Sequence, residues 1–537
     1  MNDIRTKRML GGVLAGLLFF AAALAHGQNG PGSLSSGGSS GNSSSDIAPV
    51  LLPSAPSLPA ATLYGSVSTA QEPTSSIIKL SLDDAVRRGL QHNLQVVLAA
   101  QNQRGASGER LVAFNYLLPT ISWNAQRNRN QINLAAEGFR PSTFQKFPAG
   151  LFPPSAIPNI PVVVIANVVS AEATLKQTLF DLHSLELYRA AKQEVRAVNF
   201  SFQGTRGAVI QTVIDSYLQA LASEANIANA KGLLAANAEI LRDATLEDEA
   251  GTANRLDVLR ARVQYQQQEQ VVIAQQNAFA KAKVALNREI GLPADQPIQL
   301  TDSTPYAELT VMPMDQALRL AYTNRQEYLR LQAELRSAQM QTRAVRYERL
   351  PTVDFDGNYG VTGTVGGIYH GTFAAQGTLH IPIFREAKFR GDRDVANAAA
   401  SNAMAQLANF RTQIQAQIRD NMVDVDTTGQ LVNVARSNVG LAYAVLHDAT
   451  VRFRNGIDTD LPVVQAQSSL AEAQTELVNS LYQYNVAKIA LARSVGIIDR
   501  DYRAYLGTAK QTAMSGGLDG TRARPLTPAE YDQRNGQ

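Results

Sequence analysis

Leu82–Val86, with the sequence LDDAV, and Met314–Leu318, with the sequence MDQAL, are two versions of one segment that sets the fold of the chain. The same offset of 232 residues (350 − 118) relates the Leu-Pro-Thr at Leu118–Thr120 to the Leu-Pro-Thr at Leu350–Thr352. A fixed offset between similar segments marks a repeated structural unit. The sequence therefore predicts two copies of one unit.

The later parts of the two copies keep a second offset. Gly251 and Gly456 are 205 residues apart (456 − 251), and both follow long stretches without proline or glycine clusters. We predict a first repeat over residues 78–291, a connector over 292–312 and a second repeat over 313–496. Each repeat should turn near its glycine.

Part of each copy alternates apolar and polar residues with a period of two. Ile121 and Trp123 belong to the apolar side in the first copy, and Phe355 and Phe373 belong to it in the second copy. This period is typical of strands with one apolar and one polar face. Each copy is therefore predicted to hold one strand pair, over 352–384 in the second copy.

The loop between the strands is predicted to differ between the copies. The offset falls from 232 to 204, so the first copy carries about 28 extra residues, and they fall in the proline-rich stretch Pro141–Pro161. We expect a long loop over 136–161.

Most of the remaining sequence predicts long helices whose apolar residues recur every seven positions. A sustained seven-residue repeat predicts left-handed coiled-coil packing. About 65 residues from His183 to Glu247 contain no proline and would form a helix of roughly 100 Å. The four ladders are Val213, Ala220, Ile227, Leu234 and Leu241; Val258, Tyr265, Val272, Phe279 and Leu286; Ile418, Val425, Val432, Val439 and Leu446; and Val463, Leu470, Leu477, Tyr484 and Leu491.

Composition excludes several kinds of chemistry. The 537 residues include 49 Lys and Arg, 46 Asp and Glu and no Cys, and the net charge is +3. This balance does not predict a nucleic-acid partner, and the lack of cysteine excludes disulfides and thiolate metal sites. The six histidines form no metal-ligand motif. We therefore predict no catalytic, cofactor or metal site.

The two ends of the chain are predicted to lie outside the repeats. A basic cluster precedes the apolar run Met9–Ala23, and Ala23–Ala25 supplies small residues for cleavage, so residues 1–25 are predicted to be a signal peptide. A retained N-terminal anchor is the alternative. The Gly/Ser/Pro-rich residues 26–77 predict a disordered linker, and 497–537 are expected to form a flexible tail.

Four alternating strands are too few to close a membrane barrel alone, because closed barrels begin at about eight strands. Chains would have to pool strands, and twelve strands from three copies leave a wider lumen than eight from two. Trp123, Phe355 and Phe373 would then face lipid. The alternative is a soluble β-hairpin packed on helices.

The doubled pattern, with Leu-Pro-Thr before each strand and glycine turns between helices, resembles the TolC-type outer-membrane efflux proteins from about Ile78 to Gly496. The resemblance implies a homotrimer whose twelve-stranded β-barrel lies in outer-membrane lipid of a Gram-negative cell and continues as an α-helical coiled-coil tunnel through the periplasm. It implies docking onto a periplasmic adaptor protein and an inner-membrane pump, with export of small molecules or polypeptides. The alternatives are a periplasmic coiled-coil adaptor or structural protein and an exported enzyme.

The first glycine turn, with Gly251, Asn254, Arg255 and Asp257, would lie at the periplasmic tip. The resemblance implies that the Asp257 carboxylate helps to hold the entrance closed. The spacing of Asn254 and Asp257 is also that of a helix capping box, which leaves capping as an alternative role.

The second turn departs from the family pattern. Six and nine residues after Gly456, Pro462 and Gln465 replace the aspartates of members with an acidic selectivity ring. A cation-binding ring at those positions is therefore not expected. Asp458 and Asp460 are nearer the tip and are either substitutes for the ring or solvated loop acids.

Overall fold

The computed structural model describes residues 74–133, 163–251, 254–303, 305–455, 457 and 461–507. These residues belong to one compact unit, Pro59–Gln537. The predicted signal peptide, the linker up to residue 73 and the loop over 136–161 lie outside the described residues, as do 508–537.

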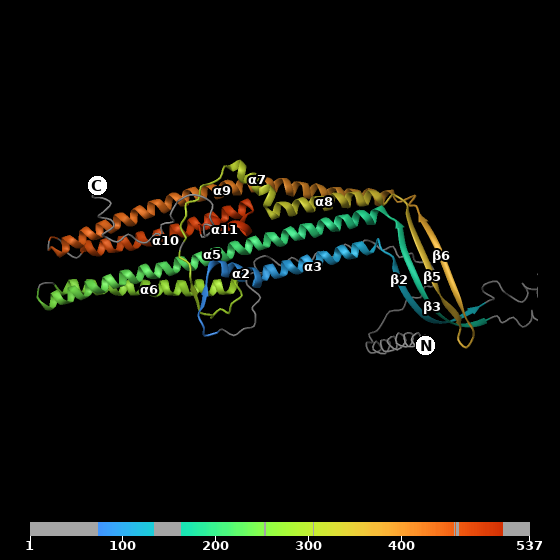
Figure 1. Ribbon diagram of the computed structural model, residues 1–537, viewed down its shortest axis with the longest axis horizontal. Helices are drawn as coiled ribbons and strands as arrows, with labels where there is room; N and C mark the ends of the chain where they lie inside the picture. Colours follow the sequence, from blue (N-terminus) through green and yellow to red (C-terminus); the bar gives the residue numbers. More distant parts are fainter. Residues whose placement is uncertain are drawn as a thin grey trace, which may run out of the picture. The chain divides into compact units, whose positions relative to one another are not determined.

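Two long antiparallel helical hairpins make up most of the described chain (Figure 1). In the first, α5 (Leu182–Glu249) packs against α6 (Arg255–Glu289), and in the second, α9 (Glu386–Arg454) packs against α10 (Leu461–Val495). The shorter helices are α2 (Leu82–His92), α3 (Leu94–Asn115), α7 (Met314–Asn324), α8 (Gln326–Tyr347) and α11 (Ile498–Leu506). None of the described helices combines the length and the apolar composition that a membrane-spanning helix needs.

The predicted seven-residue ladders are confirmed. Every ladder residue is buried or half-buried, and Val213, Ile418 and Leu286 are fully buried. The apolar ladder of one helix therefore faces its partner in the hairpin, which is the source of the coiled-coil packing.

The first helical segment is divided into two helices. The sequence favours one helix from Ser81 to about Ala113, but Asn93 takes an extended conformation (ψ 129°) and divides it into α2 and α3. The Asn93 side chain accepts a hydrogen bond from the backbone N–H of Gln95 (2.9 Å) and so caps α3. Asparagine is a strong N-cap residue, and it was the signal for this break.

Four strands form one antiparallel sheet at the end of the helices opposite the hairpin turns (Figure 1). The order is β2-β3-β5-β6, and the bounds are β2 (Thr120–Asn133), β3 (Val163–Phe180), β5 (Thr352–Thr364) and β6 (Tyr369–His380). The register shifts once, between Thr178 and Phe180 of β3. Within the described residues, β2 and β6 each pair on one edge only.

A second, very small sheet joins the beginning of the chain to the connector. β1 (Ile78–Leu80) runs parallel to β4 (Ile298–Leu300), and the Tyr217 hydroxyl of α5 lies within hydrogen-bond distance of two acceptors, Leu80 O (3.0 Å) and Asp302 Oδ2 (2.8 Å). Three residues are too few to display a period of two, so these strands leave no signal in the sequence.

The folded unit begins before the predicted end of the linker at residue 77. Thr74 N–H donates to Gln296 Oε1 (2.9 Å), and Gln296 Nε2 donates to Ser76 O (2.9 Å). This short stretch is therefore held against the connector.

The start of the predicted C-terminal tail is wrong. Residues from 497 continue as α11, in which Ile498, Tyr502, Tyr505 and Leu506 are buried in the main core with α2, α5 and α10. These four residues lie on one helical face, which is why the helix is stable where a tail was expected. The folded unit extends to Gly507.

Candidate functional site

The register of the large sheet puts its aromatic side chains on one face. Trp123 lies opposite Ala173, which lies opposite Tyr359, which lies opposite Phe373. Trp123 is 70% exposed, Tyr359 72% and Phe373 81%. Phe355 is half-buried on the same face of β5, four residues before Tyr359. Such exposure of large aromatic groups on one face indicates contact with an apolar environment.

The opposite face is polar and acidic. This side carries Asp354 and Asp356 of β5 and Glu172 of β3. One basic residue, Lys176 of β3, lies on the same side, opposite Asp356. Asn358 Nδ2 donates to Glu172 Oε2 (2.9 Å), so the two strands are also joined by side chains. The sheet therefore separates an apolar surface from a polar one, which suits a boundary between lipid and water.

The first hairpin turn is built by caps. Gly251 has a positive φ of 73°, which glycine adopts without steric cost, and Asn254 Oδ1 accepts a hydrogen bond from Leu256 N–H (3.2 Å). Asp257 pairs with Arg260 Nη1 (3.2 Å) in its own helix, and Arg255 is exposed at the first position of α6. Within one chain, Asn254 is therefore the residue that caps the N-terminus of α6. Arg260 contacts one oxygen of the Asp257 carboxylate, Oδ1.

The second hairpin turn is described in part. Gly456, Asp458 and Asp460 lie outside the described residues. Pro462 is half-buried in the first turn of α10, where its missing N–H costs no helical hydrogen bond, and Gln465 is exposed.

A small apolar cluster lies just behind the second turn. Ala449 of α9 packs with Val463 and Ala466 of α10, and Ile240 of α5 packs against them. Leu446 and Phe453 of α9 also pack against this cluster, so the two hairpins touch near their turns through an apolar contact.

The connector is fastened to α10 by polar side chains that the sequence analysis missed. Asn485 Nδ2 donates to Pro305 O (2.8 Å), and the Tyr484 hydroxyl accepts from Leu309 N–H (2.8 Å). Lys488 Nζ, fully buried, donates to Ala307 O (3.1 Å) and lies 4.5 Å from the Tyr484 ring centre. The signal for this contact in the sequence is Lys488 itself, a charged residue among the apolar residues of the heptad ladder.

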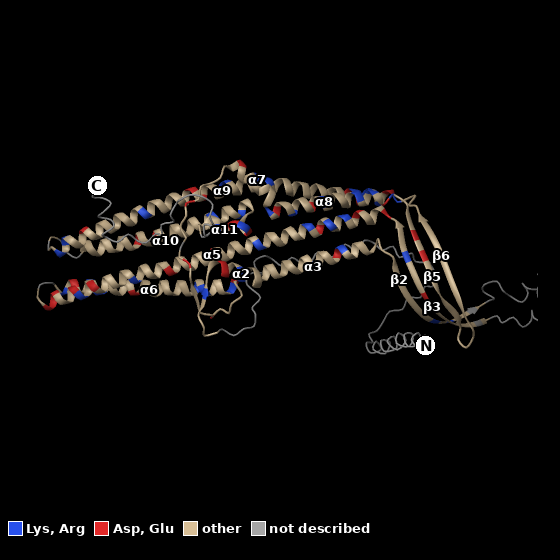
Figure 2. Cartoon of the chain, in the orientation of Figure 1, with Lys and Arg blue, Asp and Glu red and all other residues tan. Residues whose placement is uncertain are grey.

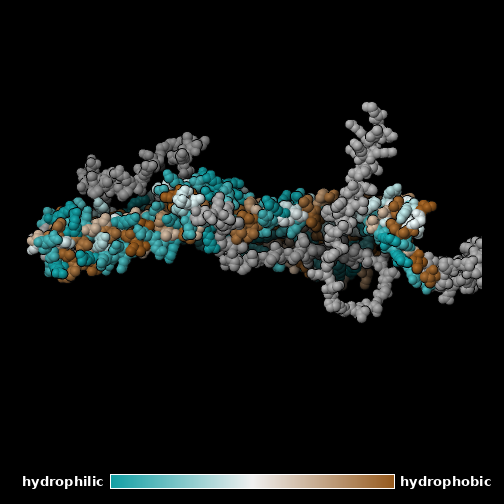
Figure 3. Space-filling model, turned by 90° about the horizontal axis from the view of Figure 1, so that it is seen from below, coloured by the Kyte–Doolittle hydropathy of each residue, from teal (hydrophilic) through white to brown (hydrophobic). Residues whose placement is uncertain are grey.

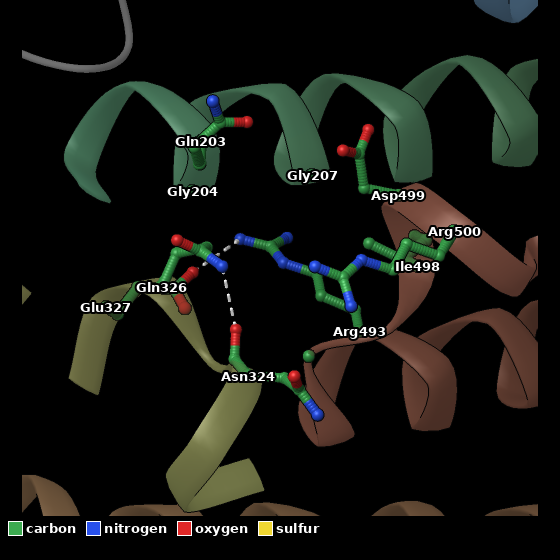
Figure 4. Close-up of a pocket in the computed structure, with 11 residues that line it drawn as sticks. Gln203, Gly204, Gly207, Asn324, Gln326, Glu327, Arg493, Ile498, Asp499 and Arg500 are labelled. Carbon is green, nitrogen blue, oxygen red and sulfur yellow. Dashed lines mark hydrogen bonds and ion pairs between the residues drawn. The ribbon is translucent and has the colours of Figure 1, made fainter. Parts of the chain in front are cut away.

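A polar cavity of about 300 Å³ lies where α5, the α7–α8 junction, α10 and α11 meet (Figure 4). Gln326 Nε2 donates to Asn324 O (2.9 Å), and Arg493 Nη2 lies 3.9 Å from Glu327 Oε1 across it. Arg493 Nη1 also donates to Gln211 Oε1 (2.9 Å). The contacts of Arg493 with Glu327 and Gln211 join the two repeats at this cavity.

The described residues contain no group of His, Cys, Asp and Glu that could hold a metal ion. The geometry that is present consists of a two-faced sheet, long paired helices and narrow turns.

The family described as outer membrane efflux protein matches this chain over residues 85–292 and 317–497. The chain belongs to the outer membrane efflux protein family. This outer membrane efflux protein is a channel component and not an enzyme, and it acts in the outer membrane and the periplasm. The alternative of a periplasmic adaptor is therefore excluded. As the outer-membrane part of a pump or secretion system, it has adaptor and inner-membrane partners.

Relatives with known roles support the assignment of this efflux protein. It is 26% identical to the toluene efflux pump outer membrane protein TtgF of Pseudomonas putida over 353 residues, which is 64% of this chain and 68% of TtgF. It is 22% identical to the alkaline protease secretion protein AprF of Pseudomonas aeruginosa over 352 residues, which is 61% of this chain and 69% of AprF.

Solved structures confirm the fold of the efflux protein. A membrane protein from Pseudomonas aeruginosa superposes with a TM-score of 0.65 at 18% identity, covering 81% of this chain and all of that one. The outer membrane protein VceC from Vibrio cholerae gives a TM-score of 0.63 at 18% identity, covering 77% of this chain and 96% of VceC.

Proposed function

We propose that three copies of this chain close into one export channel, with twelve strands around a water-filled pore and the helical hairpins forming a tunnel below it. One observation carries the proposal: the large sheet has an apolar face, a polar face and, among the described residues, two unpaired edges, β2 and β6. An open edge in lipid leaves backbone groups without hydrogen bonds, which is costly, and closure removes both edges.

The strand directions permit this closure. Each step from β2 to β3, β5 and β6 is antiparallel, so β2 and β6 run in opposite directions. β6 of one copy can therefore pair with β2 of the next as an ordinary antiparallel pair. Trp123, Phe355 and Phe373 would face lipid, and Glu172 and Asp356 would face the pore.

The internal repeat specifies which residues meet at this seam. Phe180, at the end of β3, pairs with Val353 of β5 within one chain. Phe384 is the repeat equivalent of Phe180, and Ile121 is the equivalent of Val353. In one chain Phe384 is 93% exposed and Ile121 is 75% exposed. We infer that Phe384 of one copy meets Ile121 of its neighbour.

The helices, like the strands, have a contact in one repeat that lacks its counterpart in the other. α8 packs against both α5 and α9, whereas its repeat equivalent α3 packs against α5 and leaves the other side open. The open side of α3 carries exposed Leu111 and Val112, and α9 carries exposed Val395 and Met404. Figure 3 shows brown apolar patches at the surface of the helices and of the sheet. These faces fit an α3–α9 contact between copies that repeats the α8–α5 contact.

The pore formed in this way serves export of small molecules or polypeptides from the periplasm. Its hairpin turns form the tip that an adaptor and an inner-membrane pump engage, and Asp257 is placed to bond across copies when the tip is closed. In this orientation residues 136–161 belong to the outer side of the membrane.

Mass measurement in detergent tests the assembly. The wild type is expected as a trimer, and Phe384→Asp is expected as monomers because a carboxylate would enter an apolar contact. Thr378→Asp, on the polar face of β6, is the control and should remain trimeric. A monodisperse wild-type monomer that is soluble without detergent would refute the proposal.

A further inference from the structure

Charge is divided between the two faces of the large sheet. Figure 2 shows acidic residues on β3 and β5, and the basic residues of the sheet belong to β2 and β3. The register places Arg127 and Arg129 on the face of Trp123, whereas Glu172, Asp354 and Asp356 lie on the opposite face. The apolar face therefore carries two guanidinium groups and, in the described strands, no carboxylate.

The two arginines lie at the end of the apolar face nearest the loop. Arg127 is six residues beyond Ile121, which is about 20 Å along the strand, and Arg129 is about 7 Å farther. Both arginines are exposed. Arg127 Nε donates to Asn167 Oδ1 (3.1 Å), which holds the guanidinium group in place.

The chain offers little to neutralise these charges. The sequence between β2 and β3, residues 134–162, contains one carboxylate, Glu137, against Arg140 and Lys146. β6, which would lie beside β2 in the trimer, presents Tyr369 and Phe373 on this face and no acid. An arginine on a lipid-facing surface is costly near the bilayer centre and tolerated near its boundary, where headgroups solvate it.

We propose that Arg127 and Arg129, with Asn167 fixing the first, bind the phosphate of a lipid headgroup in the outer leaflet. The guanidinium group suits this ligand because it donates two parallel hydrogen bonds to phosphate oxygens. The inference rests on the proposed function, since it requires the apolar face to lie in a bilayer.

Trp123 makes the site measurable because it is the single tryptophan of the chain. It lies on the same strand and face, four residues from Arg127. The purified full-length protein is reconstituted in vesicles that contain either a brominated phosphatidic acid or a brominated phosphatidylcholine at equal mole fraction. Quenching of Trp123 by each lipid gives their relative binding constant.

The wild type is expected to favour phosphatidic acid, because its phosphate is anionic and is not balanced by a choline cation as in phosphatidylcholine, and each loss of an arginine should reduce this preference roughly fivefold. Arg127→Gln and Lys176→Gln remove the same charge from opposite faces, so only Arg127→Gln should lower the preference. Adding inorganic phosphate should not abolish it, because the ligand is a lipid. Abolition by inorganic phosphate, or equal quenching by both lipids in the wild type, would overturn the proposal.

Two further results separate this inference from the proposed channel. If neither lipid quenches Trp123, the apolar face is not in the bilayer and the proposed function fails. If Glu137→Gln raises the preference while Arg127→Gln leaves it unchanged, Glu137 neutralises the arginines and the lipid site is refuted, although the channel stands.

Discussion

Lys488 Nζ lies 3.1 Å from the carbonyl oxygen of Ala307, in a position closed to water. This bond fixes the connector between the two repeats to α10, together with the bonds of Asn485 and Tyr484. No carboxylate of the described residues forms an ion pair with Lys488, so the ammonium group is held only by a carbonyl dipole and the Tyr484 ring.

Burial lowers the pKa of Lys488 from its ordinary value of 10.5 to about 8. The folded chain thus binds a proton at this site less readily than the unfolded chain. The charged lysine therefore lowers the free energy of unfolding by its full amount below pH 8, and this penalty falls to zero as the pH rises toward 10.5. We expect Lys488→Met to raise the melting temperature at about pH 7 and to remove the rise in stability that the wild type gains above its folded pKa. Melting curves by circular dichroism at several pH values check this. A larger pH dependence in the variant than in the wild type would contradict it.

The gate prediction concerns Asp257. Asp257→Ala is expected to raise single-channel conductance in planar bilayers and to leave the melting temperature nearly unchanged, because its exposed pair with Arg260 contributes about 0–1 kcal/mol. Arg260→Gln removes that pair without removing the carboxylate and serves as the control. If both variants conduct like the wild type, Asp257 does not close the tip.

A third prediction tests the coiled-coil ladders. Val272→Asp should destabilise the protein by about 3 kcal/mol or more, because an unpaired carboxylate would be buried between α5 and α6. Gln270→Asp, at an exposed position of the same helix, should change stability little. Chemical denaturation of both variants measures the difference, and equal midpoints would refute the burial of this ladder.

The topology prediction uses Ser155, in the sequence between β2 and β3 where we predict a long loop. Since barrel proteins place their longer loops outside the cell, Ser155→Cys should react with an impermeant maleimide on intact cells. The wild type has no cysteine and supplies the background. Reaction only after lysis would reverse the proposed orientation.

Much of the fold could be predicted because its signals repeat. The ladder through Val213 and its three counterparts specify the hairpins, and alternation around Trp123 specifies a two-faced sheet. Short and tertiary features could not be found in this way. β1 is too short for any period, and α11 depends on packing of Tyr502 against the main core.

The functional residues were harder to predict than the fold. Gly251 was identifiable because its turn requires a positive φ, whereas the bonds of Lys488 depend on a connector with no regular pattern. That Arg127 shares a face with Trp123 follows from the register of β2 and β3. The alternation in the sequence predicts the same only if the strand is known to continue past Ala125.

In the proposed assembly, the edges β2 and β6, which are unpaired within the described residues, also decide how the copies join. They are different surfaces, so each contact between copies is head-to-tail, and such a contact yields either a closed ring or an endless fibre. The outcome depends on the curvature of each four-stranded sheet, to which the irregular register at Thr178 and Phe180 contributes. A substitution that straightens the sheet would therefore not merely weaken the channel. In the proposed assembly, it would turn a closed ring of copies into an open chain.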